Sequence, residues 1–278
     1  MRIYIFVTCL LSLQIAGSQE LYVYSEPASN MPAKSVSFKM TGHFMPEQLM
    51  RDRPMQRYIP ELMVGINKNW MVHLGTSFSD IYTPGLRWES VYLYGKYRFL
   101  SNDDLHSHFR MTVFGEAAYT RNPFMMDEVS LQGDKGGILA GVIATQLWHK
   151  FALSGTVSHT QVLHQSRSNK EIYFPERTYQ TLQYSLSGGY LLLPREYTDY
   201  RQLNINLYAE LLAQQSLDRK LHYIDLAPAV QLIIASNLKL NLGYRFQLDG
   251  NMSRMAEKSW LVSLERTFLN AFPKRKKA

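Results

Sequence analysis

The stretch of sequence that decides the fold is Leu238-Lys239-Leu240-Asn241-Leu242-Gly243-Tyr244-Arg245-Phe246-Gln247-Leu248. Its even positions are all apolar or aromatic, whereas its odd positions are polar or glycine. Successive side chains of a β-strand point to opposite faces. The period of two therefore predicts a strand with one apolar face and one polar face.

The same alternation recurs along the whole chain; for example, Leu203, Ile205 and Leu207 alternate with Asn204 and Asn206. Strands are expected near 35–44, 58–67, 69–79, 88–99, 107–119, 136–147, 150–161, 179–193, 202–213, 222–234, 237–248 and 258–269. Most of these segments are longer than the roughly five or six residues usual in globular sheets. They suit tilted strands, which need about 9–11 residues to cross a bilayer.

The connections between these segments are sorted by length. Those at Lys68, Trp148-His149 and 235–237 are very short, and those around 101–104 and 194–196 are of medium length. The long connections are 45–57, 80–87, 120–135, 162–178, 214–221 and 249–257. In chain order, long connections alternate with short or medium ones, as in transmembrane barrels with short periplasmic turns and long external loops. The expected fold is all-β, a transmembrane antiparallel up-and-down β-barrel of twelve strands, rather than a soluble sandwich.

Aromatic residues support this interpretation, because Tyr and Trp collect at the two membrane interfaces of such barrels. The residues expected to form these girdles, near strand ends or on the apolar face, are Trp70, Tyr97, Phe99, Tyr119, Tyr223, Tyr244, Trp260 and Phe268.

The first residues indicate export. Met1-Arg2 precedes a short apolar run, and Ala16-Gly17-Ser18 follows it, which is the order of a secretory signal peptide. We expect a signal peptide at 1–18, a periplasmic segment at 19–34, the barrel at 35–272 and a basic periplasmic tail at 273–278. The only cysteine, Cys9, would leave with the signal peptide, so disulfide and thiol chemistry are not expected.

The formal charge of +7 would suit a nucleic-acid partner, but an exported chain argues against it, and part of the excess is the solvated tail 274–277. After residue 18 no apolar run approaches the length of a transmembrane helix. The expected location is the bacterial outer membrane with both termini periplasmic. The expected partners are outer-membrane lipid and the outer-membrane assembly machinery, and no cofactor is expected.

Four segments carry a resemblance to a protein family. They are Glu20-Leu21-Tyr22-Val23-Tyr24-Ser25-Glu26-Pro27-Ala28-Ser29-Asn30-Met31-Pro32-Ala33-Lys34, Lys96-Tyr97-Arg98-Phe99-Leu100-Ser101-Asn102-Asp103-Asp104, Leu192-Leu193-Pro194-Arg195-Glu196-Tyr197-Thr198-Asp199-Tyr200 and Leu226-Ala227-Pro228-Ala229-Val230-Gln231-Leu232. Over its mature length the chain resembles an uncharacterised family of outer-membrane β-barrels from the Bacteroidota. The resemblance implies an outer-membrane or transport-like protein without an assigned activity. Many outer-membrane barrels end on an aromatic residue, whereas Phe272 here is followed by Pro273, so an internal Phe268 or Phe272 would carry the assembly signal.

If the apolar parity faces lipid, the polar parity lines the lumen. The expected lumen-lining charges are Lys39, Glu61, Lys96, Arg98, Arg110, Glu116, Glu210, Asp225, Lys239, Arg245 and Glu265. Unpaired charge in a low-dielectric interior is costly, so these mixed signs should pair with one another. Two interpretations stay open: a closed interior held by ion pairs, and a charge-lined selectivity path.

Two chemical hypotheses attach to the outer loops. Methionine thioethers are soft ligands suited to Cu(I) but also serve as flexible apolar filler; the loop methionines are Met45, Met50, Met55, Met125, Met126, Met252 and Met255, with His43 at the same end. No tight metal motif is present and His106 and His108 fall at the other end, so no metal site is assigned.

The string His164-Gln165-Ser166 resembles the His-x-Ser pair of an outer-membrane phospholipase, in which the histidine acts as base for the serine. Because it falls in a loop, no catalytic residue is assigned. The leading expectation is a small passive channel or transport-associated barrel. The alternatives are a closed barrel that acts through its outer loops and, less favoured, a membrane-lipid hydrolase.

Overall fold

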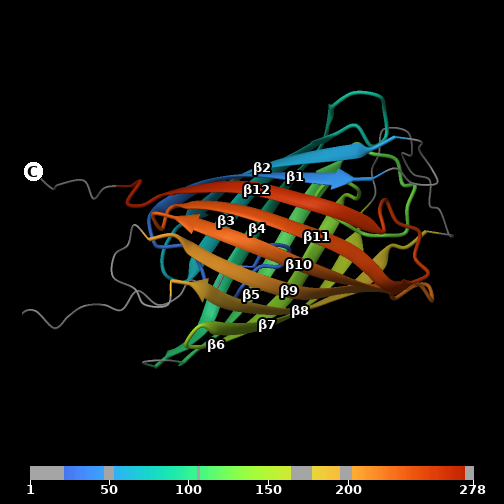
Figure 1. Ribbon diagram of the computed structural model, residues 1–278. Coiled ribbons are helices and arrows are strands. Elements are labelled where there is room, and N and C mark those ends of the chain that lie inside the picture. The colour runs from blue at the N-terminus through green and yellow to red at the C-terminus, as the bar shows by residue number, and fades with distance from the viewer. Residues whose placement is uncertain (1–21, 47–52, 105–106, 164–176, 195–201, 273–278) are drawn as a thin grey trace, which may run out of the picture.

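The structure is a closed barrel of twelve antiparallel strands, as the alternation predicts (Figure 1). This computed structural model describes residues 22–46, 53–104, 107–163, 177–194 and 202–272. The strands are β1 (Ser35–Met45), β2 (Met55–Gly65), β3 (Trp70–Ser79), β4 (Arg87–Asp103), β5 (Ser107–Thr120), β6 (Gly137–Trp148), β7 (Phe151–Val162), β8 (Gln180–Leu193), β9 (Asn204–Ser216), β10 (His222–Ile234), β11 (Leu238–Gly250) and β12 (Lys258–Phe268). Each strand pairs with its neighbours in sequence, and β1 closes the barrel on β12.

Within the described residues, no helix has the length and apolar character needed to cross a membrane.

The predicted strand positions are confirmed, with differences of more than two residues at the start of β2 and at the ends of β4 and β9. Strand β2 begins at Met55 rather than near residue 58, because Met55 pairs with Met45 at the end of β1. Strand β4 continues to Asp103, so the medium-length connection expected around residues 101–104 is wrong. Asp103 pairs with His108 across the turn, and its carboxylate also binds Arg110, which extends the ladder beyond Phe99.

The apolar side chains face outward. On β11, Leu242 is 49% exposed, whereas the neighbouring Asn241 is 3% exposed on the inner face. The same outward exposure is found for Leu62, Leu74 and Leu264 on other strands. An apolar outer wall around a polar interior inverts the arrangement of a soluble protein and is the arrangement of a transmembrane barrel.

Exposed aromatic residues lie at both ends of this wall. At the end with the short turns 66–69, 149–150 and 235–237, here called the turn end, Trp70 packs on Tyr97 with ring centroids 4.7 Å apart. At the opposite end, here called the loop end, Trp88 stacks on Tyr119. Tyr223 is an exception to the expected girdle, because it shares the inner face of β10 with Asp225 and is buried.

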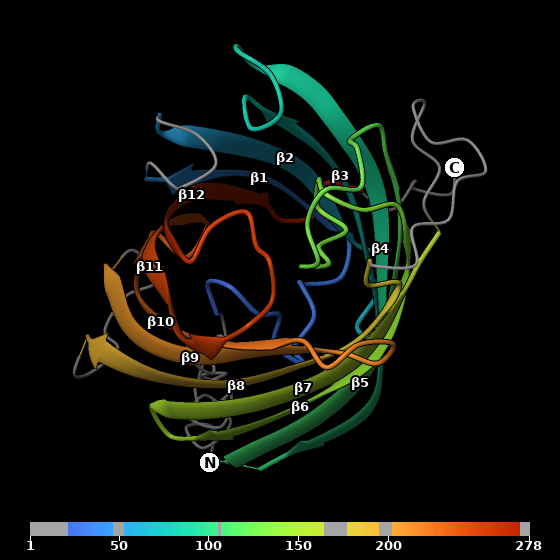
Figure 2. The same cartoon turned by 90° about the vertical axis from the view of Figure 1, so that its right-hand side faces the viewer.

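The lumen is occupied by chain from both ends. Residues 22–34 precede β1 and lie inside the barrel, where Figure 2 shows them as a blue trace within the ring of strands. From the loop end, the connection 121–136 between β5 and β6 folds inward over the lumen (Figure 2). These two pieces are called the N-terminal segment and the inner loop below, and they set the shape of the space that remains.

Candidate luminal binding site

The N-terminal segment is held by one carboxylate on the barrel wall. Glu210, on the inner face of β9 and fully buried, accepts hydrogen bonds from the backbone N–H groups of Val23, Tyr24 and Ser25 at 2.8–2.9 Å. The Ser25 hydroxyl donates a further bond to it at 2.6 Å, and Ser187 donates one at 3.1 Å. Five donors converge on this one buried carboxyl group, so the contact anchors the segment.

Glycine in the deciding stretch makes room for this segment. A Cβ at Gly243 would lie 2.6 Å from the ring of Tyr24. Any larger side chain at this inward position would therefore push the tyrosine away from β11. The glycine at an odd position of the 238–248 alternation is thus explained by contact with the N-terminal segment.

A lysine and a threonine hold the next part of the segment. The ammonium of Lys96, which is fully buried, donates to the carbonyl oxygens of Pro27 and Ser29 at 2.8 and 2.9 Å and lies 3.3 Å from a carboxylate oxygen of Glu26. Thr145 accepts a bond from the N–H of Ala28 at 2.9 Å. The segment is therefore fixed to β4 and β6 as well as to β9.

The inner loop is anchored by a buried arginine. Arg57 on β2 donates to Glu89 at 2.9 Å and to Asp134 of the inner loop at 2.5 Å. Gly133 lies against the guanidinium with a positive φ of 138°, and a Cβ there would come within 2.7 Å of it. Glycine is required at this position both by the backbone conformation and by the approach of Arg57.

A second ion-pair cluster ties together the inner loop, β10 and the connection between β11 and β12. Arg245 and Arg254 both bind Asp225, and both reach Glu128 of the inner loop, at 3.3 and 3.2 Å. The Arg254 guanidinium also lies 3.8 Å from the centroid of the Tyr223 ring, a cation–π contact. Burial opposes charge on Glu128, but the neighbouring Arg254 and Arg245 lower the pKa of its carboxyl, which favours an ionised bridge.

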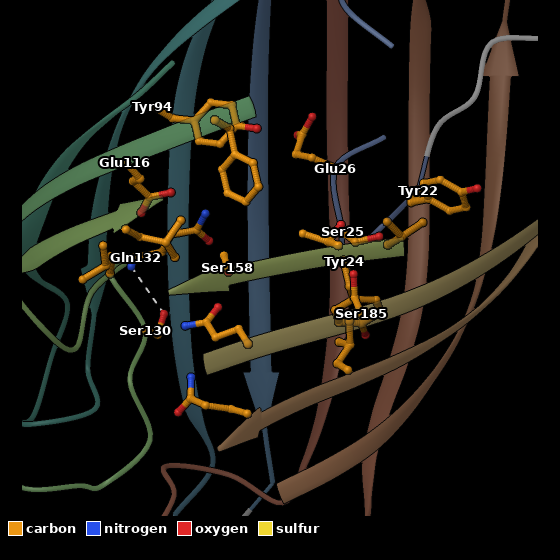
Figure 3. A pocket seen from close by; sticks show the side chains of 18 of the residues that line it. Tyr22, Tyr24, Ser25, Glu26, Tyr94, Glu116, Ser130, Gln132, Ser158 and Ser185 are labelled. Atoms are coloured by element: carbon orange, nitrogen blue, oxygen red, sulfur yellow. Dashed lines mark hydrogen bonds between the residues drawn. The ribbon is translucent and has the colours of Figure 1, made fainter. Parts of the chain in front are cut away.

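Between the N-terminal segment and the inner loop lies a cavity of about 330 Å³. Figure 3 shows how its walls converge: Tyr94 and Glu116 come from β4 and β5, Ser158 from β7, and Glu26 from the N-terminal segment. The wall further includes Thr41, His43, Glu61, His73, Tyr92, Phe114, Gln132, Ser185 and Arg245. Polar and aromatic groups therefore surround a space of the size that small ligands occupy.

The predicted lumen charges differ in the partners that the structure gives them. Lys39 lies 3.4 Å from Glu61, Lys239 lies 2.9 Å from Glu265, and Arg245 binds Asp225. Lys96 and Arg110 meet partners that were not predicted, Glu26 and Asp103. Glu210 binds backbone N–H groups. Arg98 lies on the same face of β4 as Lys96, and Glu116 lines the cavity without an ion pair in the described part of the chain.

Several residues of these clusters were missed by the sequence analysis. Glu89 occupies an outward parity by simple alternation, but a bulge in β4 opposite Ser77 and Phe78 inserts it as an extra residue and turns it inward. Arg57 falls just before the strand expected at 58–67. Asp134, Glu128 and Arg254 lie on connections, where no periodic signal indicates which side chains point inward. The sequence signal that could have indicated an inward side chain is a charged residue shortly before the start of a strand.

Most of the loop methionines in the described residues pack as apolar filler, whereas Met125 is 47% exposed. Met45 and Met55 are buried against Ile81 and contact Met255. Met126 and Met252 are also buried, while Met50 lies outside the described residues. In the parts of the chain that the structure describes, no group of three or more His, Cys, Asp or Glu residues is arranged to hold a metal ion. His43 lines the cavity and His108 binds Asp103 at 2.9 Å.

Some sequence-based expectations lie outside the described residues. They are the signal peptide at 1–18, His106, the string His164-Gln165-Ser166 and the basic tail 273–278.

Comparison with known proteins adds the class of barrel. No protein-family model matches the sequence, and no curated protein matches it. An outer-membrane channel from Pseudomonas putida F1 is similar in structure, with a TM-score of 0.57 and 11% identity over 89% of this chain and 100% of that chain. The KdgM porin has a TM-score of 0.48 and 9% identity over 84% of this chain and 99% of that chain. The fold is therefore that of a bacterial outer-membrane β-barrel.

Proposed function

We propose that this protein is a small outer-membrane channel whose solute passes through the luminal cavity. The observation that carries the proposal is a cavity of about 330 Å³, lined by polar and apolar side chains, inside a closed barrel whose outer wall is apolar. The channel from Pseudomonas putida F1 has a similar barrel. A solute would have to pass both the N-terminal segment and the inner loop, so we expect a narrow path of low conductance.

The path is lined by charges of both signs, which the ion pairs Lys39–Glu61 and Lys239–Glu265 largely neutralise. A pore built for strong ion selectivity would present one sign. We therefore propose a passage for a small solute, recognised by hydrogen bonds and aromatic contacts, rather than a general ion pore.

One observation favours a second function. The N-terminal segment makes three backbone hydrogen bonds to Glu210 and two to Lys96, so it has the contacts of a permanent plug. A permanently closed barrel would act through its outer loops instead. The channel proposal requires that the segment shift or that solute pass beside it.

We further propose that the turn end faces the periplasm and that the protein belongs to the resembled Bacteroidota family. The orientation is supported by the short turns and by β1 and β12, which respectively begin and end at the turn end. Both termini would then be periplasmic, because an even number of strands returns the chain to the side on which it began. We infer no catalytic activity.

The test is planar-bilayer conductance of the refolded mature protein, next to a variant that begins at Met31 and so lacks most of the N-terminal segment. Folding of both is checked by heat-dependent mobility in detergent gels. Discrete steps from the mature protein, enlarged in the shortened variant, support a channel narrowed by the segment. Silence from both folded proteins removes the channel proposal, and steps from the shortened variant alone favour the permanent plug.

A further inference from the structure

Glu116 differs from the other charged residues of the cavity. Glu61 has Lys39 at 3.4 Å, Glu26 has Lys96 at 3.3 Å, and Glu128 has two arginines. Glu116 lines the same cavity but has no ion-pair partner among the described residues. Because the other charges balance, this carboxyl group is the position at which a positive charge from outside the chain would be most favoured.

Several residues of the same wall carry polar atoms without hydrogen-bond partners in the described structure. His73 is buried, and its Nδ1 lies 3.8 Å from Glu61, while its Nε2 has no hydrogen-bond partner in the described structure. The hydroxyls of Tyr94 and Thr41, both at least nine-tenths buried, are also without partners there. All three residues line the cavity. If the proton of His73 resides on Nδ1, facing Glu61, its Nε2 is an acceptor.

Aromatic rings form the wall next to Glu116. Tyr94 is the direct cross-strand partner of Glu116, and its ring lies 5.6 Å from that of Phe114 and 4.8 Å from that of His73. Figure 3 shows the Tyr94 ring and the Glu116 carboxyl on the same side of the cavity. The faces of aromatic rings attract cations as well as apolar groups.

We infer that the cavity is a binding site for a small organic cation, a protonated amine with an apolar body. Its ammonium would meet Glu116 and donate to unpartnered acceptors of the wall, and its body would lie against Tyr94 and Phe114. Each requirement of such a ligand is met by a separate feature of the described residues: a carboxyl group without an ion-pair partner, several polar wall atoms without hydrogen-bond partners, and an aromatic wall. The inference rests on the proposed channel function, for which it names the solute class.

The cavity volume sets the size of the probe. At about 330 Å³ it lies at the lower end of ligand pockets, which span roughly 300–1,000 Å³. Benzylammonium is small enough for a pocket of this volume, and it carries one positive charge and one aromatic ring. Benzyl alcohol and benzoate share the ring and replace the ammonium by a neutral and an anionic group, so the three probes separate charge from apolar contact.

The experiment is isothermal titration calorimetry of the refolded mature barrel in detergent with each probe. We expect benzylammonium to bind at least tenfold more tightly than benzyl alcohol and benzoate not to bind measurably. Glu116→Gln should weaken benzylammonium binding at least tenfold, and Tyr94→Phe, which keeps the ring, should weaken it severalfold. The control is Asp249→Asn, which removes an exposed carboxylate outside the cavity and should change nothing.

Equal binding of benzylammonium and benzyl alcohol, no binding of benzylammonium, or unchanged binding by Glu116→Gln would each overturn the inference. If Glu116→Gln does not fold, the inference is tested by the binding of the three probes to the natural sequence and by the binding of benzylammonium to Tyr94→Phe. Conductance separates this result from the channel proposal. A conducting barrel that binds no amine contradicts only the inference, and an amine-binding barrel that is silent contradicts the channel but keeps the site.

Discussion

The carboxylate of Glu210 accepts a 2.9 Å hydrogen bond from the backbone N–H of Val23, 187 residues earlier in the chain. The next two N–H groups, of Tyr24 and Ser25, reach the same carboxylate. A buried carboxyl group would be costly without such donors, and unpaired N–H groups inside the barrel would be costly as well. Each side therefore stabilises the other, and the N-terminal segment belongs to the fold of the lumen.

Replacing this carboxylate should release the segment. In Glu210→Ala the three N–H groups lose their acceptor, and leaving a buried donor without a partner costs about 1–3 kcal/mol. We expect faster hydrogen exchange at residues 23–25 and larger conductance steps, with the barrel still folded. Exchange followed by mass spectrometry measures the first, and planar-bilayer recording measures the second.

The matched control for that change is Glu265→Ala. Glu265 is also a luminal carboxylate, but its bonds go to Lys239, Ser37 and Thr267 on the barrel wall. It should leave exchange at residues 23–25 unchanged. Equal acceleration in both variants would mean that barrel loosening, rather than loss of the anchor, frees the segment.

The inner loop should depend on Arg57 in a similar way. Arg57→Ala leaves the buried carboxylates of Glu89 and Asp134 without their shared cation, and breaking a buried pair in this way typically costs about 3–5 kcal/mol. Arg57→Lys keeps the charge but loses the several directed N–H donors of the guanidinium, so we expect a smaller cost. Urea unfolding of the refolded protein in detergent gives both values. A larger loss in the lysine variant than in the alanine variant would contradict the assigned role.

The strands were predictable from the sequence because a wall between lipid and a polar lumen imposes a period of two that local sequence carries. On β11 apolar residues alternate with polar residues or glycine from Leu238 to Leu248, and the burial of the side chains follows this alternation from Leu238 to Gly243. The prediction of side-chain direction failed where the backbone departs from regular pairing. The bulge that turns Glu89 inward cannot be recognised from alternation. The ladder that extends β4 to Asp103 depends on Arg110 and His108, which are contacts made only after folding.

The site was less predictable than the wall. Alternation indicates which charges point inward, and Lys39 pairs with Glu61 because β1 and β2 bring them opposite one another. Alternation does not indicate which segments of the chain occupy the lumen. The sequence of residues 22–34 has no period, and its placement depends on Glu210 and Lys96, which are far away in the chain. The isolation of Glu116 emerges only once every other partner is known.

The outward assignment of the apolar parity can be tested on β11 and β8. Leu242→Arg places a charge on the lipid face and should cost about 2–4 kcal/mol. Asn241 is a poor control, because its side chain bonds to Gln231 and Ser263 in a packed interior. Ser185, which lines the cavity, offers space for a larger side chain. Ser185→Arg should therefore cost much less in denaturant unfolding, and equal costs would contradict the facing assignment.

Lys135 is a buried lysine of the inner loop. Its ammonium donates to the carbonyl of Met126 at 2.7 Å and lies 3.5 Å from the centroid of the Phe124 ring. Burial nevertheless lowers the pKa of this lysine from 10.5 to about 7. Below pH 7 the folded and the opened loop both hold the proton, so the full cost of a buried charge is present. Between pH 7 and 10.5 the folded loop holds the neutral amine while the opened loop still takes up a proton, so the stability of the folded loop rises with pH.

We therefore expect opening of residues 121–136, measured by hydrogen exchange corrected for intrinsic rates, to become rarer as the pH is raised from 7 to 10. Lys135→Met keeps a long apolar chain and removes the titration, so its corrected exchange should not change with pH in this range. If corrected exchange changes with pH to the same extent in Lys135→Met and in the natural sequence, a group other than Lys135 controls the opening of the loop. A slope of opposite sign would mean that the charged ammonium is favoured in the folded loop, because its contacts with Phe124 and Met126 outweigh the cost of burial.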